Sequence, residues 1–301
     1  MRVLAAYTAI VERALDELFP VSVVRLPRDG EIPALLQRAM NYSLAAGGKR
    51  LRPSMLLAAV DMLGGDVQGA LAPACALELI HTYSLIHDDL PCMDDDSMRR
   101  GKPANHVAFG EGQAVLAGDG LLTHAFELMG EAALANPKRA ARYNGAIYEI
   151  ARGAGARGMV GGQCMDLFAE REGLSGEELL RYIQINKTSR LFIAAMRAAG
   201  RLCGAKQKAL DALEAYGLHF GLLFQVTDDL LDALGDAQAL GKSTGKDEAH
   251  GKLTAVSAYG LDGARQYART LNKCARGAIE QFGEGARFFV ELAEEMLMRT
   301  S

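Results

Sequence analysis

The chain has 301 residues, half of them hydrophobic, and a formal net charge of −4. This length allows one large domain or two with a sizeable core, and the small negative charge without a basic tail argues against nucleic acid as a partner. The five cysteines are scattered and lack Cys-x-x-Cys spacing, so we expect a reducing cytoplasm, no disulfide framework and no zinc site.

The start of the chain is predicted to be an amphipathic helix. The first 19 residues carry apolar side chains at helical spacing, with acids at Glu12, Asp16 and Glu17. They lack the short apolar core and the small-residue cleavage site of a signal peptide. Because the polar face is not basic, packing on a core is favoured over lying on a membrane surface. No stretch of the sequence approaches the ~18 consecutive apolar residues that a membrane span needs.

Nearly all of the chain is predicted to be helical, because proline is rare and alanine, leucine and methionine are frequent. The predicted helices span roughly 3–18, 31–45, 54–63, 70–89, 112–134, 139–165, 176–202, 206–234, 252–281 and 286–299. No run shows the strict alternation of a half-buried strand. The joints are short turns, and none is long or polar enough to be a linker. We therefore expect residues 1–301 to form a single all-α domain of about ten helices.

A basic turn precedes the third predicted helix. Residues 47–53 read GGKRLRP, and Pro53 suits the first position of a helix. Backbone N–H groups at a helix start, the helix dipole and nearby cations together make an anion site. The alternative is an ordinary charged turn.

A dense acidic run follows the fourth predicted helix, where residues 87–103 read HDDLPCMDDDSMRRGKP. The aspartates are Asp88, Asp89, Asp94, Asp95 and Asp96, and the basic residues after them are Arg99, Arg100 and Lys102. Carboxylates this close repel one another unless cations bind them or some are protonated. Their oxygens suit a hard ion such as Mg2+ that shares a substrate's phosphates, and the basic residues suit the same phosphates. The alternative is a solvated acidic loop.

Pro91 makes a regular helix through this run unfavourable. A straight helix would put Asp94 on a different face from Asp88, so we expect the break to turn Asp94 back toward the same ion. Upstream, His81, Ser84 and Asp88 are spaced at i, i+3 and i+7 and share one helical face.

A second acidic pair lies in residues 225–246, which read QVTDDLLDALGDAQALGKSTGK. Apolar residues at helical spacing predict a helix on which Gln225, Asp228 and Asp232 share one face. Acids in so apolar a helix are costly as mere decoration, because the neighbouring faces are expected to be buried. Two such helices, each followed by Lys or Arg, suggest two metal sites that face one polyphosphate pocket.

With these motifs the chain resembles a known family, the trans-isoprenyl diphosphate synthases, over nearly its whole length. The motifs that carry the resemblance are GGKRLRP (47–53), HTYSLIHDDLPCMD (81–94), RRGKP (99–103), LAGDGLL (116–122), GGQCMDL (161–167), NKTSRLF (186–192), FQVTDDLLD (224–232) and LGK (240–242). The bacterial and plastid short-chain branch, which includes farnesyl and geranylgeranyl diphosphate synthases, is the most similar.

The resemblance implies a helical bundle around a central cavity, with a role for each motif. It implies that Mg2+, more than one ion per site, is held by Asp88, Asp89, Asp94, Asp228, Asp229 and Asp232. It implies that isopentenyl diphosphate, the homoallylic substrate, is held by Lys49, Arg52, His81 and Arg100. It implies that the allylic diphosphate is held by Arg99, Lys187, Thr188, Gln225 and Lys242. Three of these cations, Arg99, Lys187 and Lys242, would stabilise the departing pyrophosphate.

The resemblance also bears on supporting residues, assembly and product. Gln163 and Asp166 are expected to support the ligands, and a homodimer is expected from the family alone. Tyr83 lies five residues before Asp88, about 7.5 Å along a helix axis. In the resembling branch an aromatic residue here goes with the fifteen-carbon product, and because Ser84 is small, Tyr83 would form the floor of the cavity. We expect farnesyl diphosphate as the main product, with geranylgeranyl diphosphate as the alternative. A simpler role for Tyr83 is packing between helices.

Two other functions are weighed against chain elongation. A class I terpene cyclase shares the first motif, but its second motif is an Asn/Asp, Ser/Thr, Glu triad that this chain lacks. A non-catalytic subunit of a heteromeric synthase usually loses part of an aspartate motif, whereas both are intact here. We therefore expect a cytoplasmic, Mg2+-dependent prenyltransferase that joins an allylic diphosphate to isopentenyl diphosphate.

Overall fold

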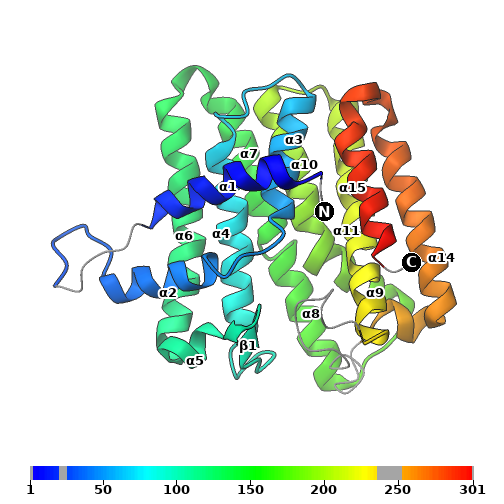
Figure 1. Cartoon of the computed structure of the whole chain (residues 1–301), viewed down its shortest axis with the longest axis horizontal. Coiled ribbons are helices and arrows are strands. Elements are labelled where there is room, and N and C mark those ends of the chain that lie inside the picture. Colours follow the sequence, from blue (N-terminus) through cyan, green and yellow to red (C-terminus); the bar gives the residue numbers. More distant parts are fainter. Residues whose placement is uncertain (1–2, 20–25, 236–252, 300–301) are drawn as a thin grey trace.

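A computed structural model describes residues 3–19, 26–235 and 253–299 of the chain (Figure 1). Within these ranges the structure is almost entirely helical, which confirms the all-α prediction. The α-helices are α1 (Ala5–Leu18), α2 (Ala34–Leu44), α3 (Leu51–Met62), α4 (Leu71–Asp88), α5 (Asn105–Phe109), α6 (Glu111–Ala135), α7 (Ala140–Ala154), α8 (Met159–Glu172), α9 (Glu177–Ile183), α10 (Arg190–Cys203), α11 (Gln207–Ala233), α14 (Ala255–Ile279) and α15 (Arg287–Met298). Shorter segments are the 3-10 turns Pro137–Arg139 and Glu280–Ala286, the π-helix Gln184–Ser189, and the strands β1 (Met98–Arg99) and β2 (Lys102–Pro103).

The central helices are buried on nearly all sides. Every residue of α3 from Leu51 to Val60 is buried, as expected for a helix that is apolar around its whole circumference. Helix α3 packs on α4 and α10, and α10 packs on α7 and α11. Figure 1 shows α1 and α2 crossing the outside of this bundle, where α1 contacts α3 and α4 and α2 contacts α6. One hydrophobic cluster joins residues from Leu4 to Met296.

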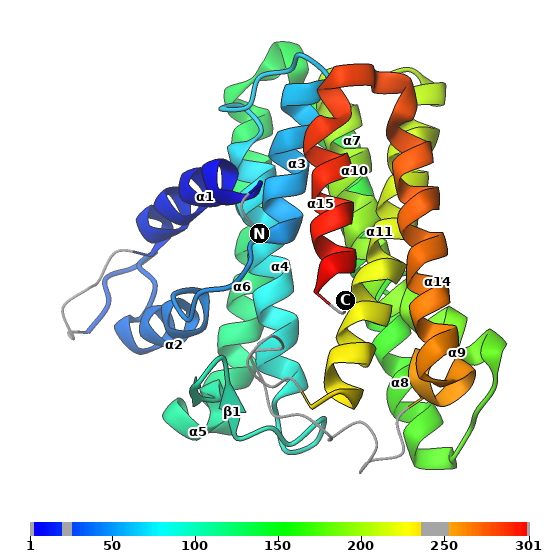
Figure 2. The same cartoon turned by 45° about the vertical axis from the view of Figure 1, so that its right-hand side comes forward.

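The bundle places the two aspartate motifs at the same end. Helices α4 and α11 carry them near their C-termini. In both views these two helices end at the lower end of the bundle, where the β1–β2 hairpin, α8 and α9 also lie (Figure 2). None of the described helices combines the length and hydropathy needed to cross a membrane.

The predicted helix 139–165 is two helices in the structure. Helix α7 ends at Ala154 and α8 begins at Met159. Between them Gly158 has φ −141° and ψ −125°, and a Cβ atom there would lie 2.1 Å from the carbonyl oxygen of Gly153. Only glycine fits this approach, so the break comes from close backbone packing that hydrophobic periodicity does not reveal.

The sequence pattern also missed a small hairpin. Strands β1 and β2 pair antiparallel, with Met98 opposite Pro103 and Arg99 opposite Lys102. The two residues between them, Arg100 and Gly101, have φ of 51° and 75°. Positive φ at both positions is what a tight hairpin turn requires. The hairpin is too short for the alternation that predicts strands.

Candidate active site

The first aspartate motif lies where α4 ends. Asp88 is the last residue of α4, and the backbone N–H of Asp94 donates to the carbonyl oxygen of Asp88 over 2.9 Å. Pro91 lies within this turn, and Asp95 follows with φ of 49°. The backbone therefore returns to the helix end, as the interruption at Pro91 predicts.

A cavity of about 990 Å³ opens beside this helix end. Its volume is at the upper end of the range for small-molecule sites, about 300–1,000 Å³. The predicted face of α4, His81, Ser84 and Asp88, lines it, together with Tyr83 and His87. The apolar part of its lining includes Leu85, Met93, Met159, Val160, Leu167, Phe168 and Phe224, and the polar part includes Arg52, Gln163, Lys187 and Thr188. The cavity thus brings charged groups and an apolar wall into one space.

The carboxylates of the first motif are held in a buried place. Burial raises the pKa of Asp88 to about 6; Lys187 and Arg99 oppose this rise, whereas Asp94 and Asp89 add to it. Burial also raises the pKa of Asp89, although Arg99 donates from Nε to its Oδ1 over 2.9 Å. A cation would stabilise the charged form of both groups.

Lys187 and Thr188 lie on the π-helix between α9 and α10. A π-helical turn inside a helix is uncommon and frequently marks a functional site. Lys187 Nζ donates to Asp166 Oδ2 over 2.6 Å. Burial lowers the pKa of Lys187, but Asp166, Asp88 and Asp94 together raise it above its ordinary value, so this side chain stays a cation at neutral pH.

A hydrogen-bonded chain runs from Thr188 into the second motif. Thr188 Oγ1 donates to Gln225 Oε1 over 2.8 Å, and Gln225 Nε2 donates to Asp229 Oδ1 over 2.8 Å. The other oxygen of Asp229 accepts from the backbone N–H of Ala255 at the start of α14, also over 2.8 Å. Asp229 is thereby fixed by two other helical segments.

The remaining acids of the second motif lie on the same helix. Asp228 Oδ1 accepts from Arg299 Nη1 over 3.0 Å, and Asp232 is 6% exposed. The cavity lining includes Phe224 of this helix, but not Asp228, Asp229 or Asp232. The structure therefore brings Asp88 of the first motif into the cavity and leaves the second motif engaged with neighbouring side chains and backbone.

The six aspartates offer only oxygen donors, which is the set that a hard cation such as Mg2+ prefers. Within the described ranges, no group of three or more His, Cys, Asp or Glu side chains is already gathered as a metal site. The fit to Mg2+ rests on donor chemistry, on the burial that raises the pKa of Asp88 and Asp89, and on the turn that returns Asp94 to Asp88.

A cluster of cations adjoins the cavity. The Arg52 guanidinium lies over the ring of Phe192, 4.3 Å from its centroid, and Lys49 Nζ lies 5.9 Å from the ring centroid of Phe224. Burial lowers the pKa of Arg52 to about 10, and burial followed by Arg299 lowers that of Lys49. Arg100 donates to the carbonyl oxygen of Gly47. The cations predicted to hold the homoallylic diphosphate thus share one region.

His81 lies among these cations as a neutral group. Burial lowers its pKa well below the ordinary value, and Arg52 and Arg100 lower it further. Its carbonyl oxygen accepts from Ser84 Oγ over 2.9 Å. A neutral imidazole next to arginines can both donate and accept hydrogen bonds.

One predicted site residue lies outside the part of the chain that the structure describes, and the structure shows two contacts that were not predicted. Lys242, predicted to hold the allylic diphosphate, lies outside the described residues. No local pattern pointed to Arg299, which reaches Asp228 from 71 positions away. Asp166 of the GGQCMDL motif, predicted only to support the ligands, binds Lys187 directly.

A cavity that joins a carboxylate and cations to an apolar wall suits a substrate with an anionic head and a hydrocarbon tail. The chain belongs to the polyprenyl synthetase family, whose sequence profile matches residues 33–285. It is 42% identical over 275 residues to the large subunit 1 of a heterodimeric geranylgeranyl pyrophosphate synthase of Arabidopsis thaliana, covering 91% of this chain and 72% of that one. It is also 42% identical to the geranylgeranyl pyrophosphate synthase of Capsicum annuum, covering 90% and 71%. Both relatives are chloroplastic.

Solved structures agree with this assignment. A farnesyl/geranylfarnesyl diphosphate (FPP/GFPP) synthase from Zymomonas mobilis matches with a TM-score of 0.84 and 34% identity, over 98% of this chain and 97% of that one. A geranyltransferase from Legionella pneumophila matches with a TM-score of 0.83 and 32% identity, over 99% and 97%. The chain is therefore a prenyltransferase of the isoprenoid synthase fold.

Proposed function

We propose that the enzyme joins an allylic diphosphate to isopentenyl diphosphate and releases pyrophosphate. The observation that carries this proposal is the cavity that Asp88, Lys187 and Arg52 share with an apolar wall. An allylic substrate needs an anion site for its diphosphate and an apolar space for its hydrocarbon, and both meet here. The cations around Arg100 supply a second anion site for the second diphosphate.

The chemistry follows from the charges. Bound Mg2+, held by the aspartates of both motifs, would act as a Lewis acid on the leaving diphosphate. Lys187 and Arg99 stabilise the negative charge that develops on the pyrophosphate as the C–O bond breaks. We propose the same role for Lys242, which is not among the residues that the structure describes. The double bond of isopentenyl diphosphate attacks the allylic cation, and the adduct loses a proton to the released pyrophosphate.

The apolar wall protects the cation from water. Residues such as Met159, Leu167 and Phe168 face the cavity, and a side chain without polar atoms cannot hold a water molecule in place. Water in that space would convert the allylic cation into an alcohol.

The product length is the finer part of the proposal. Tyr83 lines the cavity, which supports a floor there and the fifteen-carbon farnesyl diphosphate as main product. The names of the plant relatives support the twenty-carbon geranylgeranyl diphosphate at least as well. We propose a short-chain product, and an analysis of the wild-type product by mass spectrometry decides between the two.

The assembly is proposed as a homodimer in the cytoplasm. Family membership supports this assembly, although one relative is the large subunit of a heterodimer. Sedimentation of the purified chain at several concentrations tests it: a dimer mass supports the proposal, and a monomer that is active alone contradicts it.

The experiment on the reaction uses the purified chain with dimethylallyl diphosphate, isopentenyl diphosphate and Mg2+. We expect release of pyrophosphate and a longer prenyl diphosphate. Arg52→Ala should mainly raise the KM for isopentenyl diphosphate, and Lys187→Ala should mainly raise that for the allylic substrate. The absence of any elongated product would contradict the proposed function, whereas the opposite pattern of KM changes would reverse only the allocation of the two sites.

A further inference from the structure

Arg50 lies inside the basic turn but has no part in the cavity. Its neighbours Lys49 and Arg52 belong to the proposed homoallylic site, yet Arg50 is 2% exposed and is not one of the residues that line the cavity. Its φ is 46° and its ψ is 37°, a left-handed conformation that is unfavourable for a residue with a side chain. A conformation of this kind persists only where surrounding contacts impose it.

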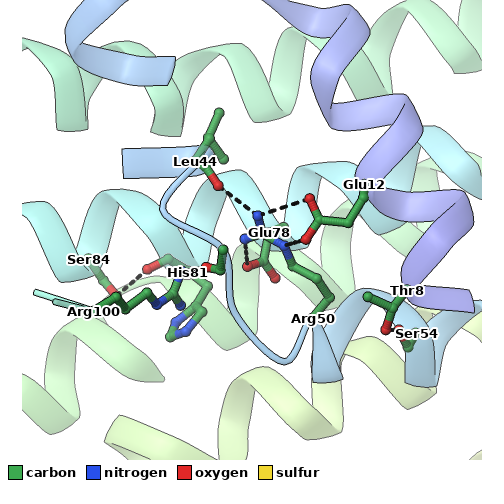
Figure 3. A network of polar contacts seen from close by, with 10 residues as sticks. Thr8, Glu12, Leu44, Arg50, Ser54, Glu78, His81, Ser84 and Arg100 are labelled. Carbon is green, nitrogen blue, oxygen red and sulfur yellow. Dashed lines mark hydrogen bonds and ion pairs between the residues drawn. The ribbon is translucent and has the colours of Figure 1, made fainter. Parts of the chain in front are cut away.

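The contacts that impose it come from three helices. Arg50 Nε donates to Glu12 Oε1 over 2.7 Å, Nη1 donates to Glu78 Oε1 over 2.6 Å, and Nη2 donates to the carbonyl oxygen of Leu44 over 2.6 Å. Figure 3 shows the guanidinium enclosed between Glu12 and Glu78. One side chain thus ties the start of α3 to α1, to the last residue of α2 and to α4.

The Arg50–Glu78 pair is fully buried. Glu78 is 2% exposed, and the exposed side-chain fractions at the ion pair are 1% for Arg50 and 2% for Glu78. A buried ion pair contributes little net stability, but removing one partner leaves an uncompensated charge. Such a pair is well suited to hold the backbone turn at Arg50 in one conformation.

The turn that Arg50 fixes also holds Arg100. Arg100 donates to the carbonyl oxygen of Gly47, and a Cβ atom on Gly48 would lie 2.9 Å from Arg100 Nη2. Figure 3 places Arg100 beside His81, one turn along α4 from Glu78. Glu78 counters the effect of burial on the pKa of both Arg52 and Arg100, so its carboxylate stabilises the charge of both cations.

We propose that the Arg50–Glu78 pair, supported by Glu12, is the positioning device of the homoallylic diphosphate site. It fixes the turn that presents Lys49 and Arg52 and that holds Arg100, and it does so without touching the substrate. This inference rests on the proposed function, because it assigns these cations to isopentenyl diphosphate.

The test compares two buried carboxylates that each bind arginine, one at the turn and one away from it. Glu78→Gln removes the charge that pairs with Arg50. Glu149→Gln is the control: Glu149 on α7 is 5% exposed, accepts from Arg197 Nε over 2.8 Å, and does not line the cavity. Titration calorimetry with isopentenyl diphosphate in EDTA measures binding without metal or turnover.

We expect Glu78→Gln to weaken binding of isopentenyl diphosphate at least tenfold and to raise its KM by a similar factor. The KM for dimethylallyl diphosphate and kcat at saturation should change less than threefold. Glu149→Gln should lower Tm without moving either KM by more than twofold. This division between the two substrates is a result that a merely structural ion pair would not produce.

A milder variant keeps the test decisive if Glu78→Gln does not fold. The Glu12 side chain is 37% exposed, so Glu12→Gln leaves the fold intact and loosens Arg50 from one side. It should weaken isopentenyl diphosphate binding about threefold and leave allylic KM unchanged. Unchanged binding in folded Glu78→Gln, or in Glu12→Gln when that variant alone folds, overturns the positioning role, and so does an equal effect on both substrates. A wild-type chain that neither binds isopentenyl diphosphate nor elongates a substrate contradicts the proposed function itself.

Discussion

At the scale of single residues, the site balances acids against bases that are partly or fully buried. Asp89 is bound by Arg99, Asp228 by Arg299, and Asp166 by Lys187. Each pair keeps a charge in place that would be costly to bury alone. We propose that a diphosphate with its cations replaces one partner of each pair, because it brings both signs of charge.

The first prediction at this scale concerns the metal. Asp88→Asn should lower turnover at least about a hundredfold, roughly 2.7 kcal/mol of barrier, because the acid at the end of α4 is proposed as a ligand. The exposed Asp16 on α1 supplies the control Asp16→Asn, which should keep wild-type turnover. EDTA should abolish activity and added Mg2+ should restore it. A folded Asp88→Asn enzyme with near wild-type turnover would remove Asp88 from the ligand set.

The second prediction concerns pH. The pKa of His81 is lowered in the folded state. In the unfolded chain this imidazole has the ordinary pKa of about 6.5, so below that pH it binds a proton more readily in the unfolded chain than in the folded one. The contribution of His81 to stability should therefore fall as pH drops from 7 toward 5. Burial also lowers the pKa of His219, which acts in the same direction, and raises the pKa of Asp88 to about 6, which acts in the opposite direction, so the test compares variants. Urea unfolding at pH 7 and pH 5 should show a smaller loss for His81→Gln than for wild type. An equal loss in both would show that His81 does not carry this effect.

At the scale of elements, the π-helix is what presents Lys187 and Thr188. It lies between α9 and α10, in a stretch for which periodicity predicts one continuous helix. Helix α8 approaches it closely at Gly162, where a Cβ atom would lie 2.1 Å from the backbone nitrogen of Lys187. The same helix carries Asp166, which binds Lys187. The close packing of α8 therefore sets the position of the lysine.

The prediction at this scale follows from that contact. Gly162→Ala should force α8 away from the π-helix, lower stability by about 1–3 kcal/mol and raise the KM for the allylic substrate. Gly130→Ala in α6 is the matched control, because nothing lies within 4 Å of a Cβ there. It should leave kinetics unchanged and stabilise by up to about 1 kcal/mol, the difference in helix propensity. Denaturant unfolding and substrate kinetics check both variants. Two variants with the same stability and KM would contradict the packing argument.

At the scale of the whole molecule, the cavity depends on several helices at once. Its lining comes from α3, α4, α8, α11, the π-helix and the turn after α4. Since one hydrophobic cluster joins residues from Leu4 to Met296, we propose that the chain is a single domain. Product length is a property of this scale, because it depends on how far the cavity extends between the helices.

The prediction here is that Tyr83→Ala lengthens the product. Tyr83 is 7% exposed, lines the cavity, and packs edge to face on His87 with ring centroids 5.7 Å apart. Removing the ring should deepen the space and shift the product by at least one five-carbon unit, measured by mass spectrometry. Tyr148→Ala, at a ring that is 56% exposed, should leave the product unchanged. An unchanged product in Tyr83→Ala would place the floor elsewhere.

The sequence by itself determined the helical class, most helix positions and the two aspartate motifs. These follow from local signals: apolar spacing, rare proline, and acids too costly to place in apolar helices without a function. The face of α4 that carries His81, Ser84 and Asp88 was predictable because a helix repeats every 3.6 residues.

Only the tertiary structure decided the rest. The break at Gly158 and the close packing at Gly162 depend on backbone atoms of segments that the local pattern does not relate. The two carboxylate partners of Arg50 lie 38 and 28 positions away, and the arginine that binds Asp228 lies 71 away. Periodicity reports which side of a helix is buried, but not which charge from another helix meets it. For that reason the sequence predicted candidate ligands, and the fold alone showed which side chains contact them.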